Sequence, residues 1–378
     1  MTAAPQLAPA PTVDRLDHLT AHDFRNIAVA DLSFPPAGVV IVGDNGHGKT
    51  NLLEAIAYFG ALRSMRNARD RDLVRHGAPA FALRAAVSAR GARHITIGVE
   101  RATARKRITV DGVTLARQTD ALGTLPSVAW SPADVALVAG GPGERRRYLD
   151  VMLALSSRAY LGALRDYRAA LDQRNAAIRS AQRTGRGPGA VAPWEPALAT
   201  RGAALVIARR AWIGGNADAF TYLCRALGEA GAAKMQYTGD AARADDPAAA
   251  LAEQLERDRQ RDLQRGMTSV GPHRDDVAIT IDGHDARTFG SAGQQRTAAI
   301  ALRLLEARTF RAHGGAHPML LLDDPFAELD RNRTIGALSL LVAEEPGQVV
   351  LAVPREDDIP RDFAHLTRWR MHGGEIQL

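Results

Sequence analysis

The chain has 378 residues, 46% of them hydrophobic, which is enough to fill more than one compact core. Its 48 Lys and Arg against 42 Asp and Glu give a net charge of +6, which favours polyanionic partners without resembling an all-basic coat. The one cysteine, Cys224, excludes a disulfide framework and Cys-rich metal sites, so we expect a reducing cytoplasm, and no apolar run approaches the ~20 residues of a membrane span.

The first part of the chain predicts a tail followed by an α/β unit. Residues 1–15 are rich in Ala and Pro and lack the basic start of a secretory signal, so we expect a flexible N-terminal tail. A β-branched run at 38–43 predicts a buried strand of a parallel sheet, and 51–59 predicts a helix with one apolar face. Alternating apolar and polar residues predict antiparallel strands at 81–89, 94–99 and 107–110.

The middle of the chain predicts an inserted helical arm domain at 151–265. Ala- and Arg-rich segments with apolar residues at helical spacing occur at 153–182, 197–227 and 247–264, and a Gly- and Pro-rich break at 184–196 separates the first two. At ~30 residues each and ~1.5 Å per residue, the first two helices span only about 45 Å. They are therefore too short for long coiled coils.

The α/β pattern returns in the last part of the chain. A strand, an amphipathic helix and two buried strands are predicted there, at 277–281, 292–311, 319–322 and 349–353. Because both ends of the chain carry α/β patterns, we predict one α/β head domain made from two segments, 16–150 and 266–378.

A glycine-rich turn between the first predicted strand and helix fits the pattern G-x-x-x-x-G-K-[ST]. Its glycines let backbone N–H groups surround phosphate oxygens, Lys49 is expected to reach the β- and γ-phosphates of ATP, and Thr50 to ligate Mg²⁺. Only three of the 48 basic residues are lysine, so the retained Lys49 itself indicates a role that arginine cannot fill. The predicted ATP-binding residues are Gly43, Asp44, Asn45, Gly46, His47, Gly48, Lys49, Thr50 and Asn51.

Two acidic residues follow the buried strand at 319–322. Asp323 is predicted to face Mg²⁺ together with Thr50, and Asp324 to polarise the attacking water as a catalytic general base, while Lys49 assists. The alternative is that both carboxylates cap a turn near Pro325.

A third motif opens the helix at 292–311. Ser291 and Gln294 form a possible capping box, which needs no ligand, but a helix start flanked by Gly290 and Gly293 can also bind phosphate. A triphosphate already held by one P-loop can contact this second phosphate-binding motif only if the motif comes from another surface. The sequence therefore predicts nucleotide sandwiched between two copies of the chain. The predicted signature residues, contacting ATP in trans, are Ser291, Gly293, Gln294 and Gln295.

Together these elements resemble an ABC-type, SMC-like P-loop ATPase head, and the chain from about residue 16 to 353 is similar to the RecF family. Beyond the P-loop, the similar segments are 130–134, 143–150, 271–276, 291–297, 321–324 and 328–330. The resemblance implies an ATP-dependent, DNA-binding homodimer that hydrolyses ATP slowly and acts with RecO and RecR in recombinase loading and the SOS response. It also implies that Asp330 lies in a loop at the dimer interface.

Two residues depart from related patterns. Ala292 stands where many RecF proteins carry an acid, and we expect this change beside the signature to alter dimer affinity. Asp324, as in RecF proteins, is one methylene shorter than the Glu of many ABC heads, so we expect weak, DNA-stimulated hydrolysis. Two alternatives to this function remain. One is an ATPase subunit of a DNA-processing nuclease, which needs an additional acidic metal cluster, and the other is a transporter ATPase subunit, which needs a membrane partner.

Arginine clusters predict contacts to DNA phosphates, although a solvated charged face is the alternative for each. Only 5% of residues are aromatic, which favours backbone contact to duplex, gapped or junction DNA over base stacking. The predicted DNA residues are Arg63, Arg66, Arg69, Arg145, Arg146 and Arg147, with a further basic cluster at 101–107. A metal site at His273, Asp275 and Asp276 is the alternative to structural hydrogen bonding there.

Overall fold

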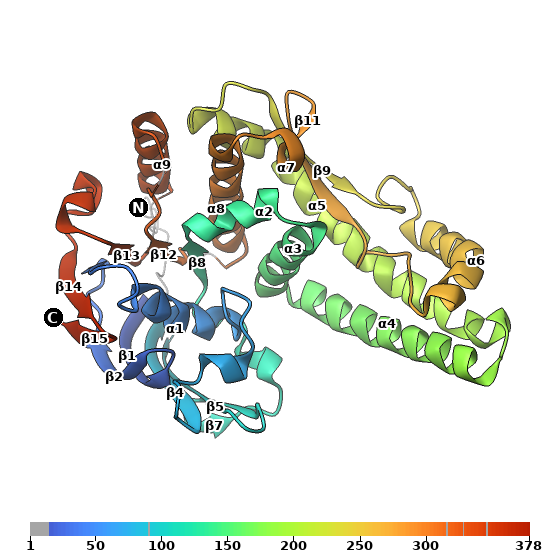
Figure 1. Cartoon of the computed structure of the whole chain (residues 1–378), viewed down its shortest axis with the longest axis horizontal. Helices are drawn as coiled ribbons and strands as arrows, with labels where there is room; N and C mark the ends of the chain where they lie inside the picture. The colour runs from blue at the N-terminus through green and yellow to red at the C-terminus, as the bar shows by residue number, and fades with distance from the viewer. Residues whose placement is uncertain (1–14, 90, 315–316, 328, 345–346) are drawn as a thin grey trace, which may run out of the picture. The chain divides into compact units, whose positions relative to one another are not determined.

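The computed structural model describes residues 15–89, 91–314, 317–327, 329–344 and 347–378 (Figure 1). The predicted tail lies outside these residues except for Arg15, which begins a strand. Contacts divide the chain into two compact units: residues 1–132 with 306–378, here called the head unit, and 133–305, the arm unit. The bounds at 151 and 265 that the sequence suggested for the arm domain stay a prediction. The arm unit defined by contacts is longer, because it begins at residue 133 and ends at residue 305.

The head unit holds an antiparallel sheet in the order β2-β1-β4-β5-β6-β7. The strands predicted at 81–89, 94–99 and 107–110 are confirmed as β4, β5 and β6, whereas β1 and β2 were not predicted. The strands are β1 (Arg15–Phe24), β2 (Ile27–Ser33), β4 (Ala80–Ala89), β5 (Gly91–Glu100), β6 (Lys106–Val110) and β7 (Val113–Thr114).

A second, mainly parallel sheet has the order β15-β14-β3-β13-β12-β8. Val42 pairs with Val353 and Asp323 with Ala352, so the carboxyl ends of β3, β12 and β13 align at one edge, where ligands of open α/β sheets bind. The strands are β3 (Gly38–Val42), β8 (Ser127–Trp130), β12 (Met319–Asp323), β13 (Val349–Val353), β14 (Thr367–His372) and β15 (Glu375–Gln377).

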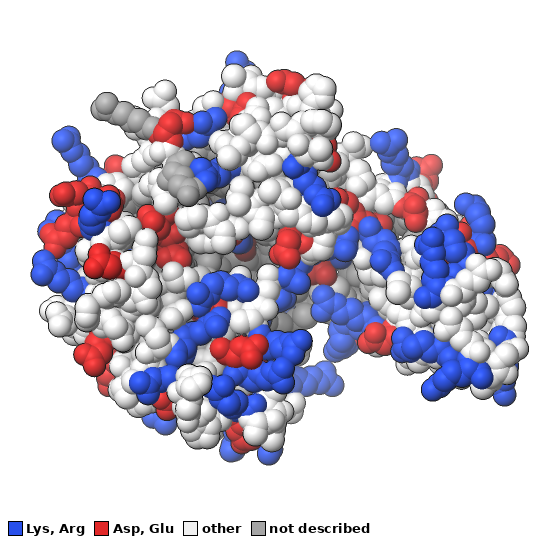
Figure 2. All heavy atoms as spheres, in the orientation of Figure 1, with Lys and Arg blue, Asp and Glu red and all other residues white. Residues whose placement is uncertain are grey.

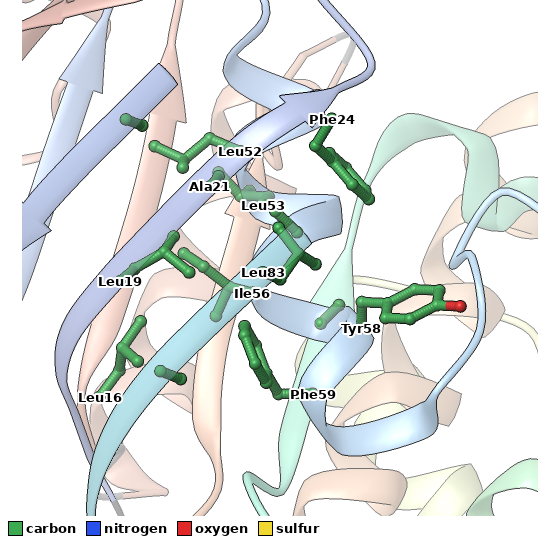
Figure 3. Close-up of a cluster of buried hydrophobic side chains, with 14 of the residues drawn as sticks. Leu16, Leu19, Ala21, Phe24, Leu52, Leu53, Ile56, Tyr58, Phe59 and Leu83 are labelled. Atoms are coloured by element: carbon green, nitrogen blue, oxygen red, sulfur yellow. The ribbon is translucent and has the colours of Figure 1, made fainter. Parts of the chain in front are cut away.

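Helix α1 (Lys49–Ala61) lies between the two sheets and is buried along most of its length (Figure 3). Its Leu52, Ile56 and Phe59 are fully buried, as the predicted apolar face requires. They join Leu16 and Leu83 of the antiparallel sheet in one hydrophobic cluster. Burial of each such side chain contributes roughly 1.5–3 kcal/mol, so this core fixes the helix that starts at the P-loop.

The arm unit contains the predicted helices and a small sheet in the order β11-β10-β9. Helix α8 begins in the arm unit and ends in the head unit, where α9 (Arg331–Ala343) also lies. The arm elements are α2 (Ala136–Ala139), α3 (Pro142–Ser156), α4 (Arg158–Thr184), α5 (Glu195–Ala226), β9 (Ala233–Thr238), α6 (Pro247–Arg265), β10 (Asp276–Ile281), β11 (His284–Asp285), α7 (Ala286–Phe289) and α8 (Ala292–Gly314).

Buried ion pairs join the arm helices. Arg174, which is fully buried, donates to Glu195 at 2.9 Å and to Asp262 at 2.7 Å, linking α4, α5 and α6. Arg209 donates to Asp150 at 2.6 Å, linking α5 to α3. Because a buried charge without its partner is strongly destabilising, these pairs hold the helices in one arrangement.

His273 is part of the same interior. Its ring bonds the Tyr167 hydroxyl at 2.6 Å and the Thr268 carbonyl at 3.1 Å, which confirms structural hydrogen bonding, and burial lowers the pKa of His273 to about 4. Within the described ranges no group of three or more His, Cys, Asp or Glu side chains is arranged to hold a metal ion. In the same residues no helix has the length and apolarity needed to span a bilayer.

Candidate nucleotide-binding site and signature motif

The P-loop follows β3 and leads into α1, as predicted. Gly46 and Gly48 have φ angles of 84° and 110°, which side chains with a Cβ rarely adopt. A Cβ at Gly48 would also lie 2.6 Å from the Asn26 amide, and one at Gly43 only 2.3 Å from the Met371 carbonyl oxygen. Backbone conformation therefore requires glycine at position 46, space requires it at position 43, and both favour it at position 48.

Lys49 lies inside this loop, with 6% of its surface exposed. Its ammonium donates to the Gly43 carbonyl and, at 3.0 Å, to that of Asp44. Burial lowers the pKa of Lys49, although the carboxylates of Asp323 and Asp324 favour its charged form. The charge is held by carbonyl oxygens that phosphate oxygens can replace.

Thr50 and Asp323 meet as the sequence predicts. The Thr50 hydroxyl donates to Asp323 Oδ2 at 2.7 Å, which joins α1 to the end of β12. Burial raises the pKa of Asp323, while Thr50 and Lys49 oppose the rise. A hydroxyl and a carboxylate oxygen this close are the hard donors that Mg²⁺ takes when substrate phosphates and water complete its shell, so these residues fit the ion.

Asp324 has a left-handed backbone, with a φ of 48°, and its N–H donates to the Ala352 carbonyl at 2.9 Å. This conformation turns the residue out of the strand direction that Asp323 follows. Burial, and then the negative charge of Asp358, raise the pKa of Asp324, while Lys49 opposes them. A carboxyl with a raised pKa beside a phosphate-binding loop has the character of a general base.

Asn51 belongs to a hydrogen-bonded network of side chains that was not predicted from the sequence. Its amide donates to Asn26 Oδ1 at 2.7 Å, and Asn26 in turn donates to the His47 carbonyl at 3.2 Å. Arg66 donates to Asn51 Oδ1 and to Glu54 Oε2, both at 2.5 Å. Burial opposes ionisation of Glu54, but hydrogen bonds from its arginine and serine neighbours outweigh it and hold its pKa below the usual range.

The remaining P-loop residues lie at the surface or under the C-terminal hairpin. Asp44, Asn45 and Gly46 are exposed. The His47 ring packs against His372 of β14, with centroids 4.4 Å apart, and the His47 carbonyl accepts from Gly374 at 2.9 Å. The hairpin β14–β15 thus braces the loop, a contact that sequence spacing could not reveal.

The signature motif forms the predicted capping box at the start of α8. Ser291 N–H donates to Gln294 Oε1 at 2.9 Å, and Gln294 N–H donates to Ser291 Oγ at 3.2 Å. Gln295 donates to the Ala286 carbonyl at 3.0 Å, which ties the motif to α7, and Ser291 is exposed while Gly293 is half-buried. The structure therefore confirms the cap, and the exposed serine at a helix N-terminus can still accept an anion.

Asp330 caps α9. It accepts from Arg333 N–H at 2.9 Å, and its side chain is also paired with the Arg333 guanidinium. This backbone hydrogen bond, followed by the Arg333 side chain, lowers the pKa of Asp330. Its predicted role in a dimer loop stays a prediction, and Glu328 of the same motif lies outside the described residues.

The arginines predicted to bind DNA differ in what they contact. Arg145 is buried, donates twice to Asp276 at 2.8 Å and also bonds three carbonyl groups, so we correct its assignment to a structural residue. Arg146 is half-buried and donates to the Asp275 carbonyl at 2.7 Å, and Arg147 pairs with Glu144 at 3.3 Å. These three residues therefore do not form one phosphate-binding triplet.

The loop after α1 keeps an exposed basic face in the head unit. Arg69, Arg71 and Arg75 are exposed there, and Arg63 and Arg66 are anchored at its start by Asn67 and Glu54 respectively. Figure 2 shows Lys and Arg side chains gathered over the part of the head unit where β4, β5 and β7 lie in Figure 1.

Two residues of the 101–107 cluster, Arg101 and Lys106, fix that loop, whereas Arg105 and Arg107 are exposed. Lys106 pairs with Asp70 at 2.8 Å, and Arg101 donates to the Val74 and Arg75 carbonyls at 2.6 and 2.7 Å. The basic loop is therefore held by a rigid scaffold, which lowers the entropic cost of contacting a partner.

A P-loop at the carboxyl edge of a parallel sheet, an Asp-Asp pair at the same edge on β12, and a capped signature helix define a P-loop ATPase head of the ABC type. The chain matches the model described as RecF/RecN/SMC N terminal domain over residues 15–357. The chain belongs to the RecF family of DNA replication and repair proteins.

Individual relatives agree with this assignment. The DNA replication and repair protein RecF of Frankia alni is 37% identical, with 96% of this chain and 98% of the relative covered, and that of Moorella thermoacetica is 38% identical, with 87% and 88% covered. A solved structure of the recombination mediator protein RecF-ATP in the RecFOR pathway has a TM-score of 0.90 at 28% identity, covering 98% of this chain and 99% of that one. The Smc head domain from Pyrococcus furiosus, at 15% identity and a TM-score of 0.56 over 97% of this chain and 96% of that one, shares the fold.

Proposed function

We propose that this chain is an ATP-driven, DNA-binding clamp: two copies close around two ATP molecules, retain DNA and reopen after slow hydrolysis. The observation that carries the proposal is the pairing of a preformed P-loop and Thr50–Asp323 site with a separate, exposed Ser291 at a capped helix start. One P-loop binds one face of a triphosphate. The signature motif of the second copy binds the other face, so nucleotide occupancy is coupled to pairing.

Within one copy, residues of the head unit bind and orient the nucleotide. Backbone N–H groups of the P-loop and the start of α1 surround the phosphate oxygens. Lys49 exchanges the Gly43 and Asp44 carbonyls for β- and γ-phosphate oxygens, so its charge stays compensated throughout. Thr50 and Asp323 hold Mg²⁺, which when bound neutralises phosphate charge.

Asp324 takes the proton of the attacking water. A raised pKa makes its carboxylate a better proton acceptor than an ordinary surface aspartate. Its side chain is one methylene shorter than a glutamate, so the distance to the water is longer and turnover is slow. Slow turnover suits a clamp in which bound nucleotide mainly keeps the dimer closed, with DNA accelerating its reset.

DNA contacts come from the arginine-rich loop of the head unit. Arg69, Arg71 and Arg75 are exposed on a loop that Lys106 and Arg101 brace from behind. Arginine contacts to phosphates carry no base information, so binding is salt-sensitive and indifferent to sequence. Since solved relatives act in the RecFOR pathway, we further propose RecR and RecO as partners of the closed dimer.

Sedimentation velocity with and without Mg²⁺-ATP tests the proposal. The wild-type chain is expected to change from monomer to dimer on adding ATP. Lys49→Ala should abolish the change because nucleotide is lost, and Ser291→Arg should abolish it while monomeric nucleotide binding persists. Dimerisation of Ser291→Arg at the wild-type affinity would overturn the trans arrangement.

A further inference from the structure

A buried carboxylate lies directly behind the signature motif. Glu229 follows the end of α5 by three residues, is 6% exposed, and donates its N–H to the Cys224 carbonyl at 3.0 Å. Its Oε1 accepts from Gln294 Nε2 at 3.2 Å and from Gly231 N–H at 3.0 Å. The segment that directly follows the long arm helix therefore contacts the signature.

Glu229 determines which way the Gln294 amide points. The Gln294 side chain has one acceptor end and one donor end, and the acceptor end must face Ser291 N–H to complete the capping box. The donor end then needs an acceptor, and the Glu229 carboxylate supplies it. Without that carboxylate the amide can rotate by half a turn, which would place two donors against each other at Ser291.

Packing alone does not account for this residue. Among the described residues Glu229 Oε2 has no hydrogen-bond partner, and a buried carboxylate with an unpaired oxygen is costly. The start of α8 offsets part of that cost because its positive end favours a nearby anion. The charge also reaches Cys224, whose pKa is raised to about 12 by burial and then by Glu229.

We propose that Glu229 is a positioning residue for the signature: through the Gln294 amide it holds Ser291 and the first turn of α8 in the orientation that binds the partner copy's nucleotide. This inference rests on the proposed function, in which Ser291 acts in trans. It also makes the end of α5 part of the dimerisation machinery, so a strain on the arm helix can change ATP-driven pairing.

The test changes Glu229 and leaves the signature residues intact. Glu229→Ala and Glu229→Leu both remove the acceptor of the Gln294 amide, so each is expected to weaken ATP-driven dimerisation by at least about tenfold. Glu229→Gln keeps a side-chain oxygen that accepts from Gln294, so its dimer affinity is expected to stay within about threefold of wild type.

Three further measurements separate positioning from folding. The affinity of each monomer for a fluorescent ATP analogue is expected to stay within about twofold of wild type, because the P-loop lies in the head unit. Glu253→Ala, an exposed acid on α6, is the matched control and should leave dimerisation unchanged. Thermal unfolding of every variant reports the folded fraction.

The outcomes are decisive in both directions. Wild-type dimer affinity in folded Glu229→Ala, or a loss in folded Glu229→Gln as large as that in Glu229→Ala, overturns the role of Glu229 while the clamp itself stands. A lowered melting temperature with unchanged dimer affinity also overturns it. If the wild-type chain fails to dimerise on ATP, or Ser291→Arg dimerises normally, the clamp and this inference both fall. If Glu229→Ala does not fold, Glu229→Leu and Glu229→Gln decide.

Discussion

Asp324→Asn is the sharpest perturbation of the proposed chemistry. Asparagine keeps the size of the side chain and tolerates the left-handed backbone at this position, where φ is 48°, so the local fold should persist. The substitution removes only the proton acceptor. A positioned general base contributes roughly 100- to 10,000-fold to rate, so we expect ATP turnover to fall by that factor, or about 3–5 kcal/mol of barrier.

Whereas Asp324→Asn should slow ATP turnover, it should strengthen ATP-driven dimerisation. Asp324 places a negative charge near Lys49 and the phosphates, and its removal reduces repulsion of ATP. The closed dimer should therefore form at equal or lower ATP concentration and live longer. Steady-state phosphate release checks the predicted fall in turnover, and sedimentation velocity on the same preparation checks the predicted gain in dimerisation.

The control is Asp357→Asn. Asp357 is exposed in the turn before Asp358, so the variant makes the same change of charge on a neighbouring loop of the head unit. It should turn over at the wild-type rate. Unchanged turnover in Asp324→Asn with intact dimerisation would refute the assignment of the base. Because the pKa of Asp324 is raised, wild-type turnover should also fall on acidification at a higher pH than an ordinary aspartate would give.

Other predictions concern binding and stability. Gly48→Ala should abolish binding of a fluorescent ATP analogue, because a residue with a Cβ rarely adopts a φ of 110° and the new Cβ would also displace the Asn26 amide that braces the loop. Charge removal at the three exposed loop arginines (Arg69, Arg71 and Arg75 to Ala) should lower the salt slope of DNA binding by up to about 3, at ~0.9 per phosphate contact; an unchanged slope contradicts that surface. His273 is neutral when folded because its pKa is about 4, so protonation favours the unfolded state and stability should fall from about pH 6.5 to 4 by up to roughly 3 kcal/mol. Chemical denaturation of His273→Asn across that range should show a flatter profile.

Local patterns predicted the nucleotide site because its geometry is local. The P-loop is a contiguous glycine-rich turn between a buried strand and a helix, and the Asp323–Asp324 pair directly follows another buried strand. Their meeting at 2.7 Å between Thr50 and Asp323 follows from parallel pairing of the strands. Such spacing and register can be inferred without coordinates.

Long-range contacts were not predictable in the same way. Arg145 looked like part of a basic triplet, but Asp276, 131 residues away, neutralises it. Strand β1 carries many polar residues, and its burial depends on the strands and helix that cover it. The contacts of Asn26 and Glu229 with the site likewise join segments that no sequence pattern connects.

The pairing of P-loop and signature across two copies is tested most directly by mixing two defective chains. Lys49→Ala lacks a working P-loop and Ser291→Arg lacks a working signature, so neither should dimerise alone. In a mixed pair, the P-loop of the Ser291→Arg copy faces the intact signature of the Lys49→Ala copy, which completes one nucleotide site. Sedimentation velocity of the equimolar mixture with Mg²⁺-ATP should therefore show an ATP-dependent heterodimer, and a mixture that stays monomeric, beside a wild-type chain that dimerises, would contradict the account.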